Sequence, residues 1–256
     1  MSIKIFCLVG ILSLAPMAYG ESSVSGPGAR TGKAFRYTAK KLGVPILAAS
    51  IKVGNGFSEE GRSLYQIEAQ VDSLRYLGVF FRMKNRFTSI VEAETCFPVR
   101  YVKEIDQEGL LAEKKNYLQT LTFGPDGKKV VVEKQGEKDK REVSLPTGTY
   151  DPLSMFARCY LKEEFHPGQE IRMSLYDGVR LRQMIFQSKK ERIKSKVYGE
   201  VEAVCLESTT SFSSFGDKEG MIRIWYTTDG KKTPVSMELD LPMGSVKFDL
   251  ELVEEI

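Results

Sequence analysis

The single histidine, His166, is the first residue to consider for catalysis. It lies in the segment Glu164-Phe165-His166-Pro167-Gly168, directly before an expected turn. An imidazole works as a general base only when a partner orients it and a target lies within hydrogen-bond reach. The neighbouring sequence supplies no such partner, so we interpret His166 as an exposed loop histidine. With one imidazole and no Cys-x-x-Cys spacing, neither a metal site nor another cofactor is expected.

Carboxylates offer a second route to chemistry. Glu92 and Glu94 are two residues apart, so a strand would place both on one face, and glycoside hydrolysis uses such a pair. Glutamates on the wet face of a strand give the same pattern, and we favour that interpretation. Motifs for a serine nucleophile (GxSxG), a phosphate loop (GxxxxGK[ST]), a zinc protease (HExxH) and an EF-hand are absent. The chain is therefore not expected to be an enzyme.

Cysteine thiols are the remaining reactive groups. Cys96, Cys159 and Cys205 lie in the body of the chain, whereas Cys7 lies in an apolar N-terminal stretch. An oxidising compartment would allow one disulfide and one leftover thiol, in any of three pairings. Three buried thiols that behave as small hydrophobic groups explain the sequence equally well. The sequence does not choose between these alternatives.

The first twenty residues have the pattern of an export signal. Lys4 precedes an apolar run from Ile5 to Leu14, and Ala18-Tyr19-Gly20 is a small-residue cleavage site. The run is shorter than the roughly 20 residues that span a bilayer. The alternative is an uncleaved anchor. We predict a signal peptide over residues 1–20, a flexible leader over 21–32 and one β-rich domain over 33–256, in a periplasmic protein that is not integral to the membrane after cleavage.

Charge excludes one class of partner and leaves another open. The formal net charge of the 256 residues is only +3, so no nucleic-acid partner is expected. The segment Lys189–Lys196 is locally basic. It would contact anionic lipid or an acidic polymer, or it would protect a sheet edge from pairing with other chains, and we favour edge protection.

Period-two alternation of apolar and polar residues predicts antiparallel strands. In the last of these segments, Val246, Phe248, Leu250 and Leu252 are predicted to share the buried face. Asp-Gly pairs predict tight hairpins at residues 126–127, 177–178 and 229–230, and the charged segment 133–142 predicts a longer one. Successive hairpins indicate a meander of about ten strands rather than a βαβ sheet.

Two short helices are predicted between the strands. Asp151 is suited to cap a helix that begins at Pro152, buries Leu153, Phe156 and Ala157, and ends before Pro167-Gly168. Ser73 is a candidate cap for a second helix, whose apolar side would be formed by Leu74, Leu77, Phe80 and Phe81.

Two sequence blocks together resemble a known family. The first joins Asp151-Pro152-Leu153-Ser154 to Gly168 and Tyr176-Asp177-Gly178; the second joins the run from Ile224 to Asp229 to Pro234-Val235 and Gly244. They resemble domain of unknown function 3108, a family of exported bacterial proteins, over roughly residues 34–252. The resemblance implies a β-rich envelope protein with an incurved sheet or open barrel, like those of periplasmic lipid carriers. It implies no catalytic residues, and we interpret Asp151, Pro152, Ser154, Asp177, Gly178, Asp229 and Pro234 as structural.

The expected fold is all-β with minor α content: a strongly curved antiparallel sheet or half-open β-barrel with one or two short helices. Such a sheet favours a monomeric, non-enzymatic binder of a hydrophobic ligand or envelope lipid on its concave face. The candidate lining residues are Trp225, Tyr226, Phe186 and Met184. An envelope protein bound at a sheet edge is the alternative, and a glycan-active enzyme is the third hypothesis.

Overall fold

The computed structural model describes residues 30–78, 80–109, 112–212, 218–241 and 244–256. The predicted signal peptide and most of the predicted leader lie outside these residues. The packed chain begins earlier than predicted, because the Arg30 side chain is buried and its guanidinium donates to the Tyr160 carbonyl at 3.3 Å.

A single sheet of sixteen strands makes up nearly all of the described chain. In chain order the strands are β1 (Lys33–Lys41), β2 (Val44–Val53), β3 (Phe57–Glu59), β4 (Arg62–Ser73), β5 (Phe81–Glu92), β6 (Pro98–Gly109), β7 (Ala112–Phe123), β8 (Lys129–Lys134), β9 (Arg141–Ser144), β10 (Thr149–Tyr150), β11 (Glu170–Tyr176), β12 (Leu181–Ser195), β13 (Gly199–Phe212), β14 (Lys218–Thr227), β15 (Pro234–Leu241) and β16 (Gly244–Glu255). The helices are the 3₁₀ turn η2 (Arg75–Leu77) and α1 (Pro152–Leu161).

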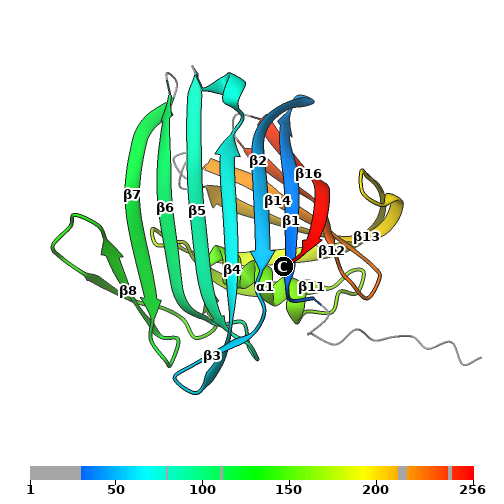
Figure 1. Cartoon of the computed structure of the whole chain (residues 1–256). Coiled ribbons are helices and arrows are strands. Elements are labelled where there is room, and N and C mark those ends of the chain that lie inside the picture. The colour runs from blue at the N-terminus through cyan, green and yellow to red at the C-terminus, as the bar shows by residue number, and fades with distance from the viewer. Residues whose placement is uncertain (1–29, 79, 110–111, 213–217, 242–243) are drawn as a thin grey trace, which may run out of the picture.

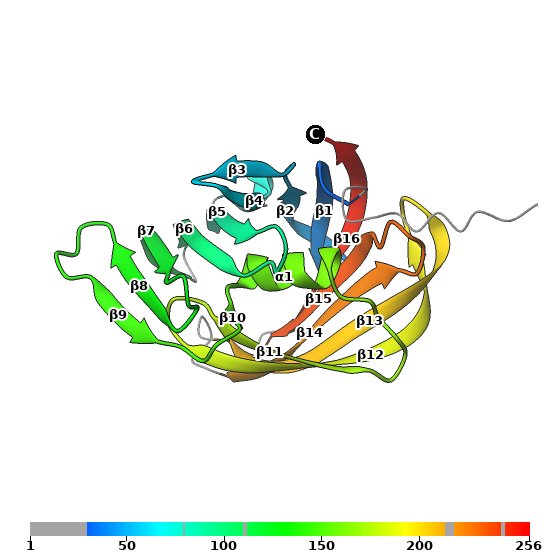
Figure 2. The ribbon, with the colours of Figure 1, turned by 90° about the horizontal axis from the view of Figure 1, so that it is seen from below.

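The sheet curls around α1 but does not close. Its strand order runs β10 to β16, then β1, β2 and β4 to β9, with β3 paired to β4 alone. No backbone pairing of the described residues joins the end strands β9 and β10. Seen from below, the sheet bends around α1 and leaves one side open (Figure 2). The predicted all-β, half-open architecture is therefore confirmed, with more strands than predicted.

The meander has one exception. All strand pairs of the described chain are antiparallel except β10 with β11, where Thr149 lies opposite Ser174 in a parallel pair. Helix α1 is the crossover between these two strands. The prediction of a meander is wrong here, because a strand of two residues is too short to show alternation of apolar and polar residues in the sequence.

Hairpin turns lie where the Asp-Gly pairs predicted them: between β7 and β8, between β11 and β12, and between β14 and β15. In the second of these, the Asp177 carboxylate accepts from the backbone N–H groups of Val179 and Arg180 at 2.8 and 2.9 Å. The charged segment 133–142 forms the β8–β9 hairpin.

Helix α1 begins as predicted, with Asp151 as its N-cap and Pro152 as its first residue. Asp151 Oδ1 accepts from the N–H groups of Leu153 and Ser154 at 2.8 and 3.0 Å, while Ser154 Oγ accepts from the Asp151 N–H. This reciprocal capping box fixes the first turn. The predicted inward residues Leu153, Phe156 and Ala157 are all buried.

The second predicted helix is wrong. Only the three-residue turn η2 forms there, and its N-cap is Leu74 rather than Ser73. Ser73 ends β4, and its hydroxyl accepts from the Met83 N–H at 3.0 Å across the β4–β5 pair. Phe80 is 60% exposed, so the predicted apolar side is not buried.

The predicted buried face of the last strand is also only partly correct. The β1–β16 register shifts so that Arg36 pairs with Leu252 and the next residue, Tyr37, pairs with Leu250. This bulge turns Leu252 outward, 44% exposed, while Leu250 stays buried as predicted.

Candidate functional site

The inner face of the sheet has two regions of different character. Around α1, aromatic side chains of the helix pack against those of the sheet. The ring centroids of Phe35 and Tyr160 lie 5.5 Å apart, and those of Phe156 and Tyr226 lie 6.5 Å apart. Figure 1 shows that β4 to β7 extend well past α1 toward the opposite end of the sheet.

Past the helix, the inner face carries apolar side chains that are only half-buried. We call these residues the inner wall: Leu47, Ala49, Ala69, Phe87, Ile222, Ile224 and Leu239. Strand register places them on one face, since Ala49 lies opposite Tyr37 and Ala69 lies opposite Ile51 and Phe87. Half-buried apolar surface on the inside of an open sheet is suited to bind an apolar ligand and provides no polar groups for catalysis.

Polar groups line the other side of the interior, beside the opening. The Lys103 side chain is buried, and its ammonium donates to the Asp177 carbonyl at 2.7 Å. Burial lowers the pKa of Lys103, and the nearby Asp177 carboxylate opposes that shift. From β9, the Arg141 guanidinium donates to Tyr176 Oη and to the Gly178 carbonyl, each at 3.0 Å. The β11–β12 turn is therefore fastened to β6 and β9 by side chains, across the side where the sheet is open.

The four predicted lining residues do not share one face. Phe186, Met184 and Tyr226 point inward and are buried in the core. Trp225 points to the outer face, where its indole N–H donates to Glu191 Oε2 at 2.8 Å. Adjacent residues of a strand face opposite ways, so Trp225 and Tyr226 do not line one surface.

Asp229 and Pro234, predicted as structural residues of the second block, lie at the β14–β15 turn and at the start of β15. Asp229 Oδ1 accepts from Thr227 Oγ1 at 2.5 Å and from the Lys232 N–H at 3.1 Å, which orders the β14–β15 turn. Pro234 begins β15, and its carbonyl accepts from the Tyr37 hydroxyl at 2.8 Å.

The candidate catalytic groups are not assembled. His166 is exposed in the loop before β11, as predicted. Glu92 ends β5, whereas Glu94 lies in the following turn, so the prediction that one strand face carries both is wrong. A small cavity of about 140 Å³ includes Glu92 and Asp126, but Glu92 accepts from Thr95 Oγ1 at 2.9 Å and Asp126 from the Lys128 N–H at 3.0 Å. Among the described residues, no group of three or more His, Cys, Asp or Glu side chains is placed to hold a metal ion.

Cys96, Cys159 and Cys205 are unpaired and buried. Burial raises the pKa of Cys96 to about 11 and those of Cys159 and Cys205 to about 12. The structure thus favours buried thiols over a disulfide.

We therefore expect none of these three thiols to react with Ellman's reagent in the folded protein, and all three to react in guanidinium chloride, because thiolates form poorly when buried. Alkylation followed by peptide mass mapping assigns each thiol. Recovery of two of them as a disulfide-linked peptide would contradict the expectation.

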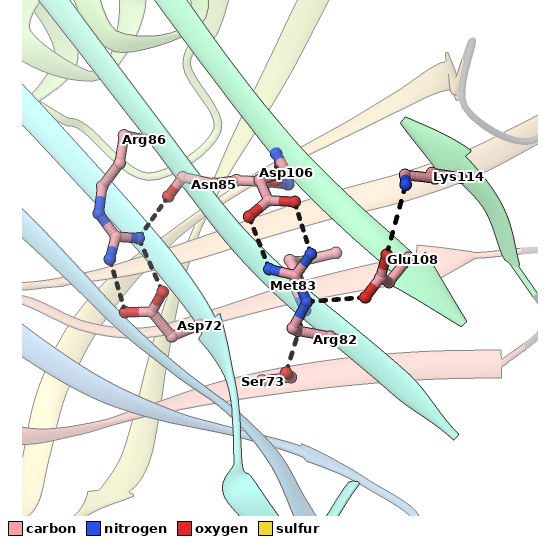
Figure 3. Close-up of polar contacts among 9 residues, drawn as sticks. All are labelled: Asp72, Ser73, Arg82, Met83, Asn85, Arg86, Asp106, Glu108 and Lys114. Atoms are coloured by element: carbon pink, nitrogen blue, oxygen red, sulfur yellow. Dashed lines mark hydrogen bonds and ion pairs between the residues drawn. The ribbon is translucent and has the colours of Figure 1, made fainter. Parts of the chain in front are cut away.

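The outer face is charged but internally neutralised. Figure 3 shows Arg82 between Asp106 and Glu108, and Arg86 against Asp72. The Arg82 guanidinium donates to both Asp106 oxygens at 2.6 and 2.9 Å, and Arg86 to both Asp72 oxygens at 2.7 and 3.1 Å. Such bidentate pairs fix the register of β4, β5 and β6, and the charges of these four side chains neutralise one another.

The basic segment Lys189–Lys196 is neutralised in part. Three of its lysines contact carboxylates: Lys189 with Glu207, Lys190 with Glu202, and Lys196 with Glu251. Backbone hydrogen bonds on the β11 side of β12 end at Ser188, so from Lys189 onward β12 is paired with β13 alone. This placement supports the edge-protection interpretation.

Neither helix of the described chain has the length and apolarity that spanning a membrane requires. No curated protein matches the sequence. A beta-barrel-like protein of domain of unknown function DUF1849 from Brucella abortus is similar in structure, with a TM-score of 0.55 at 10% identity, covering 89% of this chain and 98% of that one. The hypothetical protein CT021 from Chlamydia trachomatis matches with a TM-score of 0.37 at 9% identity, covering 92% of this chain and 91% of that one. The first likeness supports the barrel-like fold and nothing further.

The sequence itself matches a family model over residues 35–251, from β1 through most of β16. The matched span contains α1, its capping box, the β11–β12 turn and the whole inner wall. The chain belongs to the family described as protein of unknown function DUF3108.

Proposed function

We propose that this protein is an exported, periplasmic, non-enzymatic binder of a hydrophobic ligand, with envelope lipid as the favoured class. The observation that carries the proposal is the inner wall, where apolar side chains are left half-exposed on the concave side of an open sheet. Covering such surface is worth about 25 cal/mol per Å², so a guest with an alkyl chain gains affinity there without polar contacts.

Electrostatics are consistent with an apolar guest of low charge. The carboxylates and guanidinium groups of the outer face satisfy one another, and the buried Lys103 is engaged by the Asp177 carbonyl. A strongly charged small molecule would find no preformed set of opposite charges on the inner wall. The apolar part of a lipid is the portion that this surface fits.

The edge-binding alternative has weaker support. The terminal strands β9 and β10 have four and two residues. The one-sided part of β12 carries lysines, which discourage added strands. A partner protein would therefore gain few backbone hydrogen bonds at any of these three edges.

Adjacent alanines of β2 allow a matched test of the ligand site. Ala49 lies on the inner wall, opposite Tyr37, whereas Ala48 lies opposite Asp72, whose carboxylate pairs with Arg86 on the outer face. We expect Ala49→Glu to weaken binding of a fluorescent fatty acid or phospholipid about tenfold, since a carboxylate is costly beside an alkyl chain. Ala48→Glu introduces the same charge and should leave binding unchanged. Fluorescence titration gives both affinities.

Native mass spectrometry of the protein purified from a cell-envelope fraction, followed by organic extraction, identifies any ligand retained from the cell. A retained mass that extracts as lipid would support the proposal. A clean ligand-free mass with no uptake of either fluorescent lipid would contradict it, as would equal losses in the two alanine variants.

A further inference from the structure

Four large hydrophobic side chains stand in solvent on two neighbouring turns. They are Leu42 of the β1–β2 turn and Val44 at the start of β2, 96% and 54% exposed, and Tyr76 and Phe80 of the β4–β5 connection, 59% and 60% exposed. We call these four residues the rim patch. Single exposed apolar residues are ordinary, but a group of four on adjacent turns marks an interaction surface.

The two turns are held together. The Leu74 N–H donates to the Ile46 carbonyl at 3.1 Å, and the Tyr76 hydroxyl donates to the Pro45 carbonyl. Both turns lie at the end of the sheet away from α1 (Figure 1). The rim patch is therefore a fixed feature at the end of the sheet to which the inner wall leads.

Leu42 is an unfavourable residue for its backbone. Leu42 and Gly43 have φ of +50° and +79°, which is the two-residue hairpin turn that favours Asn, Asp or Gly at its first position. The β3–β4 hairpin has the same geometry, with φ of +51° and +77°, and places a polar residue, Glu60, at that position. Leucine here costs conformational energy and gains no packing, because its side chain is almost wholly exposed. A functional requirement for an apolar side chain at the β1–β2 turn explains why leucine occupies position 42.

The charges around the rim patch are cationic. Lys41 precedes Leu42 and Arg75 precedes Tyr76, and within the described parts of the chain neither side chain forms an ion pair. The nearby carboxylates are already engaged, Asp72 with Arg86 and Asp249 with Lys40. The surface around the exposed apolar side chains thus has an excess of positive charge.

We propose that the rim patch docks on a lipid bilayer that contains anionic headgroups. Leu42 and Phe80 enter the acyl boundary, Tyr76 lies at the headgroup level with its amphipathic ring, and Lys41 and Arg75 contact the anionic lipids. A protein partner fits less well, since four side chains on two turns fall far short of the roughly 20 residues a side of a stable protein interface. This surface is distinct from the inner wall, and its test requires no bound ligand.

Flotation with vesicles of phosphatidylcholine, with and without phosphatidylglycerol, measures the docking directly. The protein should be used as the cell processes it, with its N-terminus determined by mass, so that every variant shares the same start. We expect binding to the mixed vesicles that weakens as salt is raised and is poor to phosphatidylcholine alone. Leu42→Asn should weaken binding about tenfold, because a leucine side chain leaves the bilayer. Phe80→Ser should do likewise.

Leu42→Asn also separates docking from folding, since asparagine suits the turn better than leucine. Its melting temperature should equal or exceed that of the wild type. Val197→Asn is the matched control, because Val197 is 38% exposed on the β12–β13 turn; its vesicle binding should be unchanged. Absence of vesicle binding, or equal binding of the wild type and Leu42→Asn, would overturn the proposal. A dimer that dissociates in Leu42→Asn without any vesicle binding would instead assign the patch to self-association.

Discussion

Replacing Asp151 by alanine is expected to lower the free energy of unfolding by about 3 kcal/mol, the sum of a lost N-cap and of buried donors left unsatisfied. The carboxylate is fully buried and accepts from Leu153 N–H, Ser154 N–H and, at 2.7 Å, Ser89 Oγ. Since Ser89 lies on β5, the substitution breaks the first turn of α1 and its link to the sheet together. Urea denaturation followed by circular dichroism measures the change.

Asp151→Asn is the informative control, because asparagine caps helices as well as aspartate and carries no charge. Burial raises the pKa of Asp151 to about 6, although hydrogen bonds from Ser89, Ser154 and Leu153 oppose the shift. In the unfolded chain the pKa is about 3.9, so between these values the folded state binds the proton more strongly.

The wild type should therefore gain stability as the pH falls from above 6 toward about 4, and Asp151→Asn should lack this gain. At neutral pH we expect Asp151→Asn to be at least as stable as the wild type. An asparagine variant as unstable as the alanine variant would show that the charge itself is required.

Gly178→Val is expected to destabilise the fold by about 3 kcal/mol, from backbone strain and crowding together. Gly178 has φ of +88°, and a Cβ there would lie 2.7 Å from Gln119 Oε1 and 3.1 Å from Leu121 Cδ1. The Gln119 amide can swing aside, but Leu121 is fully buried and cannot. The substitution therefore pushes the β11–β12 turn away from β7.

Gly127→Val is the matched comparison, because it introduces a similar backbone strain without steric crowding. Gly127 occupies the Asp-Gly turn between β7 and β8 with φ of +65°, and a Cβ there meets nothing within 4 Å. We expect a loss of about 1.5 kcal/mol, from strain alone. Urea titrations of both variants give the difference. Equal losses would mean that the β11–β12 turn is not pressed against the sheet.

Features set by a few consecutive residues could be predicted from the sequence. The capping box at Asp151 and the three Asp-Gly turns depend on hydrogen bonds that span two or three positions, so the local sequence determines them. The curved antiparallel sheet follows from repeated alternation between such turns. The exposed loop position of His166 was predictable for the same reason.

Features that depend on distant partners could not be predicted in this way. The bulge that exposes Leu252 arises from the register of β16 on β1, more than 200 positions earlier in the chain. The parallel pairing of β10 with β11 depends on where α1 packs. The outward orientation of Trp225 becomes clear only beside Glu191.

The candidate site was predicted only in part. The concave face and its apolar character follow from alternation, yet Phe186, Met184 and Tyr226 lie in the packed core, and the inner wall is made of other residues. The position of Lys103 could have been recognised from the sequence. It follows Tyr101 by two positions, so alternation places both side chains on the inner face of the strand. Inward lysines of this kind indicate a buried contact, here with the Asp177 carbonyl.

The unjoined strands β9 and β10 give the molecule a mechanical property that a closed barrel lacks. The girth of a closed barrel is fixed by its strand number and stagger, and widening it means breaking a whole ladder of backbone bonds. Across this opening, three side-chain hydrogen bonds from Lys103 and Arg141 hold the β11–β12 turn. Contacts of this kind, together with the packing of Gly178 against Gln119 and Leu121, hold the two sides of the opening near one another. The width of the opening can therefore change without the loss of a ladder of backbone hydrogen bonds.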